Sequence, residues 1–427
     1  MPLAGTGPDR RRVILLASAV VLFSLSAAYL GWGFRQLLVG PPPVAAIDLR
    51  YRWMEERYFA RRQNPLDQVR LALGRVEEGS AAVTVDPEIG PMPPKAVGYP
   101  PWSLVTGLAL APPIAFPATR IWMALLDVAA LAAIARLAWR ELRDLGREEA
   151  LVGVAASLAL VSNLFTVSAG QYGLVVNALV LAALGLAGRG RGIVAGLCLA
   201  LALVKPQSAG LFALLFLVRG WLVPLLTAGV VLVAEAALAL AWIRASPLRF
   251  ANDLYALASG LWGEGYGPLA LLLGHGGDPG RLVPLLGAAG LGLALGLVVA
   301  WRRATLLVQL AIAAVIGRLW TYHHTYDNVM LVFLLLALLR AALEQPSRPL
   351  VVGALGAVAA TLVAPVSWRL HHALPVLQAA HVLAWIGGLA VLLAATPRSP
   401  RTRAAPSLRR DGEDGGVARA EDGWAEP

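Results

Sequence analysis

The sequence predicts an all-α polytopic membrane protein, and three observations lead to that prediction. The 427 residues are 58% hydrophobic and only 15% charged, and the mean hydropathy of +0.66 is far above that of a soluble domain. Apolar stretches recur along the chain, and a helix needs about 20 such residues to cross about 30 Å of hydrocarbon. The net charge of +10 fits the Arg and Lys excess of cytoplasmic loops and headgroup contacts. We therefore expect membrane lipid as a partner, and no nucleic acid.

Residues 13–34 form the first apolar stretch, and a basic cluster precedes them. A signal peptide has the same order of segments, but its apolar region is shorter and a small-residue cleavage site follows it closely. We expect an uncleaved first helix with the N-terminus in the cytoplasm. Cys198 is the only cysteine, so no internal disulfide can form.

The other apolar stretches give the remaining candidate crossings. They are residues 120–139, 150–168, 172–188, 193–204, 207–219, 221–243, 283–301, 304–320, 329–344, 349–366 and 374–395. The segments 193–204 and 207–219 are too short to span hydrocarbon alone. They indicate half-helices that meet at a protein-lined pocket, where broken backbone is tolerated.

Residues 101–118 are also apolar, but prolines bracket them. We expect this stretch to enter and leave the membrane on the same side. With that topology the basic loops 139–148, 188–191 and 301–303 all lie on the cytoplasmic side. The whole pattern predicts a bundle of about 11–13 transmembrane helices.

The chain reads as a single transmembrane domain, residues 1–396, followed by a disordered cytoplasmic tail, 397–427. Two external loops, 40–99 and 244–281, interrupt the bundle. In the first loop Ile47, Tyr51, Met54 and Tyr58 recur at helical spacing. This spacing predicts an amphipathic juxtamembrane helix at the lipid interface.

Neither core packing nor solvent-exposed loops account for four groups of polar residues. Ionisable residues at membrane depth usually face a cavity or a site. The four groups are Asp48; Gly170-Gln171; Lys205-Pro206-Gln207; and His323, His324, Tyr326 and Asp327. The predicted topology brings all four groups to the same external face.

Each group also has a purely structural interpretation. Asp48 lies in the first turn of a predicted helix and four residues before Arg52, so capping and pairing could explain it. Gln171 could join two helices by a hydrogen bond. Lys205 could extend its ammonium to the interface, but this does not explain why a proline follows at once.

The two adjacent histidines leave a choice open. Asp327 is four residues after His323 and three after His324, so it could hold either ring in one tautomer. We find no metal-ligand cluster with suitable spacing and expect no metal.

A carboxylate, a buried cation and a His–Asp pair at one face suit the displacement of a lipid-linked phosphate by an alcohol. A lysine at a broken helix suits a phosphate, because freed backbone N–H groups there also bind anions. A lone carboxylate suits a general base that deprotonates a hydroxyl. The cation would stabilise the charge that builds on the leaving phosphate.

These residues, in their order along the chain, make the sequence resemble the polyprenyl-phosphate-mannose-dependent membrane mannosyltransferases, glycosyltransferase family 87 of the clan C architecture. The matching pieces are Asp48 with Tyr51 and Asn64-Pro65; Tyr99-Pro100-Pro101; Gly170-Gln171 with Asn177; Lys205-Pro206; and Tyr326-Asp327 behind a histidine. The resemblance implies a clan C glycosyltransferase-like bundle in the plasma membrane. It also implies inverting transfer of a sugar, typically mannose, at the external face.

The resemblance further implies roles for individual residues. Asp48 would be the catalytic base, Lys205 would contact the donor phosphate, and His323 or His324 would orient or neutralise the same phosphate. The cavity-lining residues would be Tyr99, Gln171, Gln207, Tyr326 and Asp327. The implied partners are a polyprenyl-phosphate sugar and a glycolipid or glycan acceptor, with no cofactor besides the lipid-linked donor.

Three alternatives stay open at this point. A transporter or lipid flippase also places charge at broken helices, although its breaks commonly pair up between inverted repeats, and we find no repeat here. A non-catalytic scaffold of an envelope-assembly complex would keep Asp48 and Lys205 as packing groups. Within the enzyme class, the sugar could be arabinofuranose or another glycosyl group.

Overall fold

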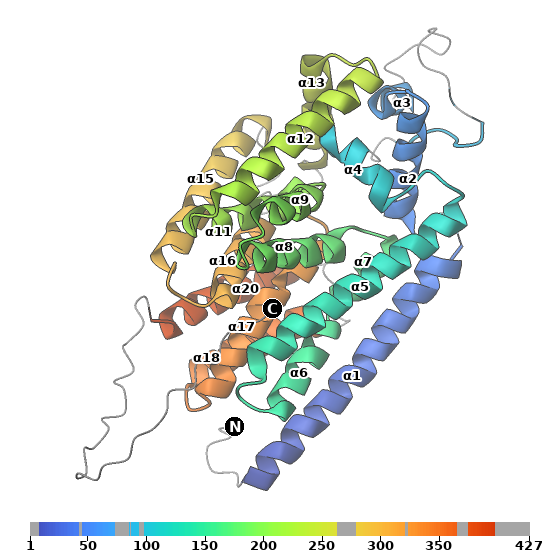
Figure 1. The fold of residues 1–427 in the computed structure, drawn as a ribbon. Helices are drawn as coiled ribbons and strands as arrows, with labels where there is room; N and C mark the ends of the chain where they lie inside the picture. Colours follow the sequence, from blue (N-terminus) through green and yellow to red (C-terminus); the bar gives the residue numbers. More distant parts are fainter. Residues whose placement is uncertain are drawn as a thin grey trace, which may run out of the picture.

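The structure is a computed structural model that describes residues 8–41, 45–72, 85, 87–93, 98–262, 279–320, 323–364 and 375–397. Helices joined by short turns make up this described part, and it contains no strand (Figure 1). The predicted all-α class is therefore confirmed. The expected disordered tail lies, from residue 398 on, outside the described residues.

Five helical segments of the described chain are long and apolar enough to cross a membrane. They are α1 (Pro8–Val39), α5 (Phe116–Leu142), α12 (Leu222–Trp242), the 3-10 helix η2 (Thr325–Leu331) continued by α17 (Val332–Glu344), and α20 (Pro375–Ala395). The polytopic membrane class is thus confirmed. Further apolar helices lie between them: α8 (Gly173–Ala187), α9 (Gly192–Ala202), α15 (Pro279–Ala300, of which Gly287–Ala300 is apolar), α16 (Leu306–Trp320) and α18 (Pro349–Val363). The total of 11–13 crossings stays a prediction.

One expected crossing, 150–168, is broken. Its two parts are α6 (Arg147–Leu158) and α7 (Val161–Ala169), which are bent by 45° relative to each other. The side chain of Asn163 donates hydrogen bonds to the carbonyl oxygens of Ser157 and Leu158, both at 3.0 Å. These bonds satisfy carbonyl groups that the break leaves without helical partners.

The main hydrophobic core fills the space between the bundle helices. α1 packs on α6 and α7, α8 lies between α5 and α9, and α9 packs on α12. The segment Thr325–Glu344 is the most deeply buried of the five long segments. A helix that is apolar on all sides, as α17 is, suits such a central position.

A second, smaller core lies at one end of the bundle, where α2 (Ile47–Ala60), α3 (Pro65–Ala72), α4 (Trp102–Leu110) and α13 (Pro247–Trp262) gather (Figure 1, top). We call these four helices the cap. Met54, Leu66, Leu104 and Phe250 are among the buried side chains that join them. α4 has nine residues and is about 14 Å long. It is too short to cross a membrane alone, and re-entry of the stretch 101–118 stays a prediction.

The helix predicted in the first loop is present as α2, but its buried face differs from the predicted stripe. Met54 and Tyr58 are buried, and so are the charged residues Arg52, Glu55 and Glu56. The predicted apolar stripe did not include these charged residues. The cap instead packs protein against both sides of α2, since the helix contacts α4, α3, α5 and α7.

Candidate active site

Lys205 is placed by a break between two short helices. It follows α9 and precedes α10 (Pro206–Ala209), with φ −119° and ψ 79°. A proline ring disfavours helical geometry in the residue before it, so Pro206 ends the helix at this point. The side chain of Lys205 is turned into the bundle and is only 2% exposed. Trp102 donates to the Leu203 carbonyl oxygen at 2.9 Å and so satisfies one group of the broken turn.

Gly170 brings the start of α2 close to Gln171. It ends α7 with φ 67°, and a Cβ at this position would lie 2.5 Å from the Cβ of Leu49. The Ala46 N–H donates to the Ser168 carbonyl oxygen at 2.8 Å, which fixes the start of α2 on the end of α7. Only glycine permits both the left-handed backbone and this approach.

The side-chain amide of Gln171 is the centre of the site. Its Oε1 accepts from Lys205 Nζ at 3.4 Å and from the Tyr99 hydroxyl at 3.5 Å. Its Nε2 donates to the Tyr326 hydroxyl at 3.1 Å. Gln171 also favours the ionised form of the Asp48 carboxyl and so lowers its pKa. Residues from four separate segments of the chain meet at one amide through these hydrogen bonds.

Lys205 and Asp327 form a buried ion pair through Nζ and Oδ1. The same carboxylate accepts from the His324 backbone N–H at 3.2 Å, which caps η2. The Lys205 ammonium also lies 5.0 Å from the centre of the Tyr326 ring. The cation thus has a carboxylate, an amide oxygen and an aromatic face around it.

The structure distinguishes the two histidines. His323 Nδ1 lies 3.1 Å from Asp327 Oδ2, and its Nε2 lies 3.1 Å from the Gly317 carbonyl oxygen. A carbonyl only accepts, so Nε2 carries a proton, and Nδ1 donates to Asp327 only when the ring is doubly protonated and charged. His324 instead places its ring 5.0 Å from that of Tyr326. Of the two rings, His323 is the one held by Asp327.

Two hydrogen bonds fix η2 against α7 and α8. Thr166 Oγ1 donates to the Tyr326 carbonyl oxygen at 2.9 Å, and Asn177 Nδ2 donates to the Val329 carbonyl oxygen at 3.1 Å. Both side chains are buried. They hold the segment that carries Asp327 at a fixed distance from Gln171.

Asp48 is partly buried at the start of α2. Burial raises the pKa of its carboxyl above the ordinary value, while the hydrogen bond from Gln171 and the positive charges of Lys205 and Arg52 offset part of the rise. An aspartate with a raised pKa is a stronger base than an exposed one once it is ionised.

Two features of the structure bear on the structural interpretations of Asp48, capping and pairing with Arg52. α2 has no side-chain hydrogen bond at its N-cap, Ala46. Arg52 forms its ion pair with Glu55 at 2.5 Å, and its guanidinium lies 4.3 Å from the centre of the Tyr99 ring. Arg52 therefore belongs to the wall behind Tyr99.

The remaining predicted residue, Gln207, is partly buried in the first turn of α10, two residues after Lys205. In the part of the chain that the structure describes, no group of three or more His, Cys, Asp or Glu side chains could hold a metal ion.

One charged residue of this region was missed by the sequence analysis. Arg318, in α16, is 3% exposed and donates through Nε to Asn328 Oδ1 at 2.5 Å. Its Nη1 has no hydrogen-bond partner among the described residues, and its charge interacts with that of Asp327. An arginine inside the predicted crossing 304–320 is the signal that could have identified it.

A polytopic bundle with a carboxylate and a buried cation at its helix breaks belongs to one of two classes, a membrane transferase or a membrane transporter. Residues 98–321 match the family model described as glycosyltransferase family 87, and this range is more than half of the chain. The chain therefore belongs to glycosyltransferase family 87, and it is a membrane glycosyltransferase. No curated protein and no solved structure matches it.

The matched range contains part of the site. Tyr99, Gln171 and Lys205 lie inside it, whereas Asp48 and the segment 323–327 lie outside. The hydrogen bonds of Gln171 connect the two parts.

Proposed function

We propose that the protein transfers a sugar, mannose, from a polyprenyl phosphate to a hydroxyl of a cell-envelope glycolipid or glycan, with inversion and without a metal. The observation that supports this most is the position of Gln171, whose amide oxygen accepts from Lys205 at 3.4 Å and whose side chain stabilises the ionised form of Asp48. A proton acceptor and a fixed positive charge are thereby only one side chain apart. The polyprenyl phosphate and its mannose are proposed on the resemblance of the ordered motifs.

In the proposed reaction, the acceptor hydroxyl oxygen attacks the anomeric carbon of the donor sugar. The bond between that carbon and the phosphate oxygen breaks, and its electron pair leaves with the polyprenyl phosphate. Asp48 accepts the proton of the hydroxyl, so the base must be ionised before the step.

Lys205 stabilises the negative charge that develops on the leaving phosphate. An ammonium has three N–H donors, and in this structure Asp327 and Gln171 accept from it. Its remaining donor capacity is available to a phosphate oxygen. His323 holds Asp327 from the other side at 3.1 Å and so orients the carboxylate that positions Lys205.

We place the site at the external face of the plasma membrane, with both termini in the cytoplasm. The four cap helices cover one end of the bundle (Figure 1). Asp48 lies at the start of the cap helix α2, and Tyr99 lies just before the cap helix α4. The basic loops between the crossings fall on the opposite side in the predicted topology.

The test uses the purified protein in lipid nanodiscs with radiolabelled polyprenyl-phosphate mannose. The acceptor is the glycolipid fraction extracted from cells that lack the protein. We expect wild type to form a labelled glycolipid and Asp48→Asn to form none, because an amide cannot take the proton. Asp67→Asn is the matched control, since Asp67 lies in the cap but pairs with Arg249 at 2.9 Å, away from Gln171.

Turnover of Asp48→Asn at the wild-type rate would contradict the assigned base. Counterflow of the labelled lipid without a glycosylated product would favour a flippase, and product formation by both Asp48→Asn and Lys205→Ala would favour a scaffold. Comparison of the lipid-linked glycans of cells with and without the protein identifies both the sugar and the acceptor.

A further inference from the structure

Arg318 is a buried cation that has none of the contacts assigned to the donor. It lies in the last turn of α16 and is only 3% exposed. A guanidinium stays protonated inside proteins, so its positive charge is present within the bundle. An ionisable residue in a membrane-spanning helix usually serves a site, and an unpaired one is costly to bury. A role in the reaction would explain this placement.

The contacts of Arg318 hold its charge without neutralising it. Nε donates to Asn328 Oδ1 at 2.5 Å, and the guanidinium carbon lies 5.3 Å from the centre of the Trp385 ring in α20. Among the described residues, Nη1 has no hydrogen-bond partner and no carboxylate forms an ion pair with the guanidinium. The carbonyl end of α16 supplies only a partial negative charge. The guanidinium is thus fixed in position and carries an excess charge.

Two cations act on Asp327. Lys205 forms an ion pair with it, and the charge of Arg318 interacts with it as well. Asn328, which accepts from Arg318, is the next residue of η2. Both cations thus act on two consecutive residues of the same short helix. We call Lys205, Asp327 and Arg318 the charge triad, and its two positive charges and one negative charge leave one excess positive charge.

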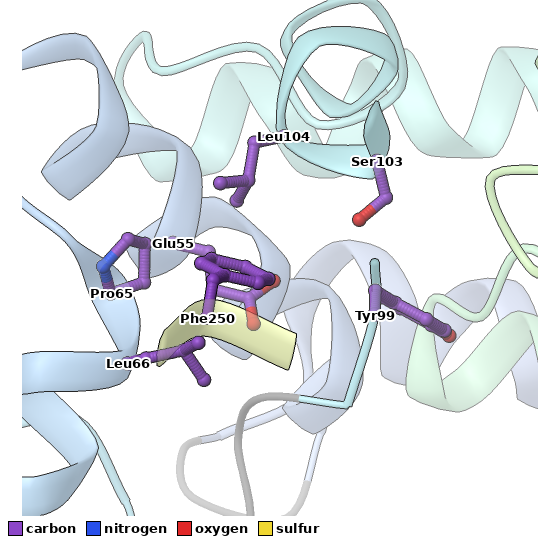
Figure 2. Close-up of a pocket in the computed structure, with 7 residues that line it drawn as sticks. All are labelled: Glu55, Pro65, Leu66, Tyr99, Ser103, Leu104 and Phe250. Atoms are coloured by element: carbon purple, nitrogen blue, oxygen red, sulfur yellow. The ribbon is translucent and has the colours of Figure 1, made fainter. Parts of the chain in front are cut away.

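Arg52, the other buried arginine near the site, acts on a different part of it. Its Nη1 pairs with Glu55, and its guanidinium lies 4.3 Å from the centre of the Tyr99 ring. Figure 2 shows Glu55 and Tyr99 among the side chains that pack at this place in the cap. The charge of Arg52 interacts with that of Asp48, the proposed base. Arg318 is therefore the arginine on the side of Asp327, where the phosphate is proposed to bind.

The excess charge of the triad matches the change in charge of the donor. The proposed donor is a phosphodiester with one negative charge, and cleavage of its bond to the sugar adds a second charge to the leaving polyprenyl phosphate. Lys205 and Asp327 alone are neutral as a pair. The charge of Arg318 offsets the added charge, and it acts without contact because the effective dielectric constant of a protein interior is low.

We propose that Arg318 is a positioning residue of the donor site, whose uncompensated charge stabilises the second negative charge of the leaving phosphate through the charge triad. Its hydrogen bond to Asn328 also holds η2, so that Asp327 keeps Lys205 in place. The inference rests on the proposed function, and it adds that Lys205 alone does not provide the charge that the reaction needs. Arg318 does not touch the reacting atoms.

The decisive variant is Asn328→Asp. It places a carboxylate at the atom that already accepts from Arg318, so it neutralises the guanidinium and keeps the hydrogen bond. We expect kcat to fall about tenfold with the acceptor KM unchanged, because the second phosphate charge develops only during the step. A purely structural role predicts an unchanged kcat, since a charged hydrogen bond would fix η2 more firmly. Turnover is measured in nanodiscs with labelled polyprenyl-phosphate mannose and the glycolipid fraction.

Two substitutions of Arg318 separate its charge from its shape. Arg318→Lys keeps the charge and should retain most of the wild-type kcat, whereas Arg318→Met should lose at least as much as Asn328→Asp. Arg219→Met is the matched control. Arg219 donates to Gln309 Oε1 at 2.9 Å, near the other end of α16, and lies 5.3 Å from the centre of the Trp221 ring, so its contacts are of the same kind. Its removal should leave kcat unchanged.

The outcomes separate the two proposals. A wild-type kcat in Asn328→Asp overturns the role of the Arg318 charge and leaves the proposed function standing. If thermal unfolding in detergent shows that Asn328→Asp does not fold, the substitutions of Arg318 decide, and equal kcat values for Arg318→Lys and Arg318→Met overturn the inference. A similar loss in Arg219→Met and Arg318→Met overturns it too. Absence of product with wild type overturns the proposed function, and the inference falls with it.

Discussion

Lys205 and Asp327 are 122 residues apart in the chain, and they form an ion pair in which both side chains are 3% exposed. The pair forms where the break between α9 and α10 lies against η2. The counterion of each charge therefore comes from a distant segment of the chain. Removing two charges from water is costly unless each finds partners in the interior. Here Gln171 Oε1 accepts from Lys205, and the His324 backbone N–H donates to Asp327.

The first prediction concerns the stability that depends on this pair. Asp327→Asn leaves the Lys205 ammonium without its counterion, and we expect a loss of about 3–5 kcal/mol in the free energy of unfolding. Thermal unfolding in detergent, followed by tryptophan fluorescence, measures the loss. The double variant Lys205→Met with Asp327→Leu should recover most of it, because no buried charge remains.

An exposed pair provides the control. Arg340 and Asp144 are 2.7 Å apart, and the Asp144 side chain is 56% exposed. Asp144→Asn should cost less than about 1 kcal/mol. Equal losses in Asp144→Asn and Asp327→Asn would show that burial of the Lys205–Asp327 pair has no energetic effect.

The second prediction concerns the approach of α2 to α7. Gly170→Ala introduces a Cβ that would lie 2.5 Å from Leu49 Cβ, on a backbone with φ 67°. The resulting displacement of α2 moves Asp48 away from Gln171, so we expect loss of stability together with loss of transfer activity.

Gly190→Ala separates the two causes. Gly190 has φ 74° and nothing within 4 Å of an added Cβ, so this variant carries the backbone strain without the clash. It should cost roughly 1 kcal/mol and leave activity unchanged. If Gly170→Ala behaved like Gly190→Ala in both measurements, the contact with Leu49 would not position the base.

The third prediction concerns the pH dependence of transfer. Burial raises the pKa of Asp48, and the base acts only when ionised, so the rate should fall as the pH falls through this raised pKa. The midpoint of the acid limb should therefore lie above the ordinary aspartate value of about 3.9.

Gln171→Leu removes the hydrogen bond that favours the ionised form of Asp48. The acid limb of this variant should move to higher pH, in addition to any loss of rate. A wild-type midpoint at or below about 3.9, or an acid limb that Gln171→Leu leaves in place, would contradict the assigned environment of the base.

The fourth prediction concerns stability and Glu55. Burial raises the pKa of Glu55 to about 8, and the nearby Arg52 offsets part of the rise. Between the unfolded value of 4.5 and about 8, the folded state then binds more protons than the unfolded state. The stability from this group is complete below that window and declines as the pH rises through it.

Thermal unfolding in detergent at several pH values measures this decline. Wild type should lose more stability than Glu55→Gln as the pH rises from about 4.5 to about 8. Glu88→Gln is the control, because the Glu88 side chain is 71% exposed and lies in the first external loop. If the stability of wild type and Glu55→Gln changed with pH in the same way, the Glu55 carboxyl would not contribute to the pH dependence of stability.

Much of the fold could be predicted from the sequence because apolar runs and their breaks are local features. The crossing predicted at 221–243 is α12, Leu222–Trp242, and Lys205-Pro206 marks a real break. The bend between α6 and α7 could not be predicted, because it depends on one side chain, Asn163, that satisfies two freed carbonyl groups.

The site was harder to predict because its contacts are long-range. The shared face of Asp48, Gln171, Lys205 and Asp327 follows from topology, but the central place of the Gln171 amide does not. Arg52 is a further example: its spacing from Asp48 indicated a helical pair, but its ion pair is with Glu55, one turn on in α2, and the long-range packing of the cap places the Tyr99 ring against its guanidinium.

The start of α8 also sets a constraint on chain length. Gln171 stands just before this helix, and Asn177, six residues later, donates to the Val329 carbonyl oxygen. One inserted residue between them would rotate the rest of α8 by about 100° and carry Asn177 away from η2. All residues from 171 to 177 are buried, so this stretch allows no change of register, whereas an insertion at the turn near Gly190 would leave the Gln171 and Asn177 hydrogen bonds in place.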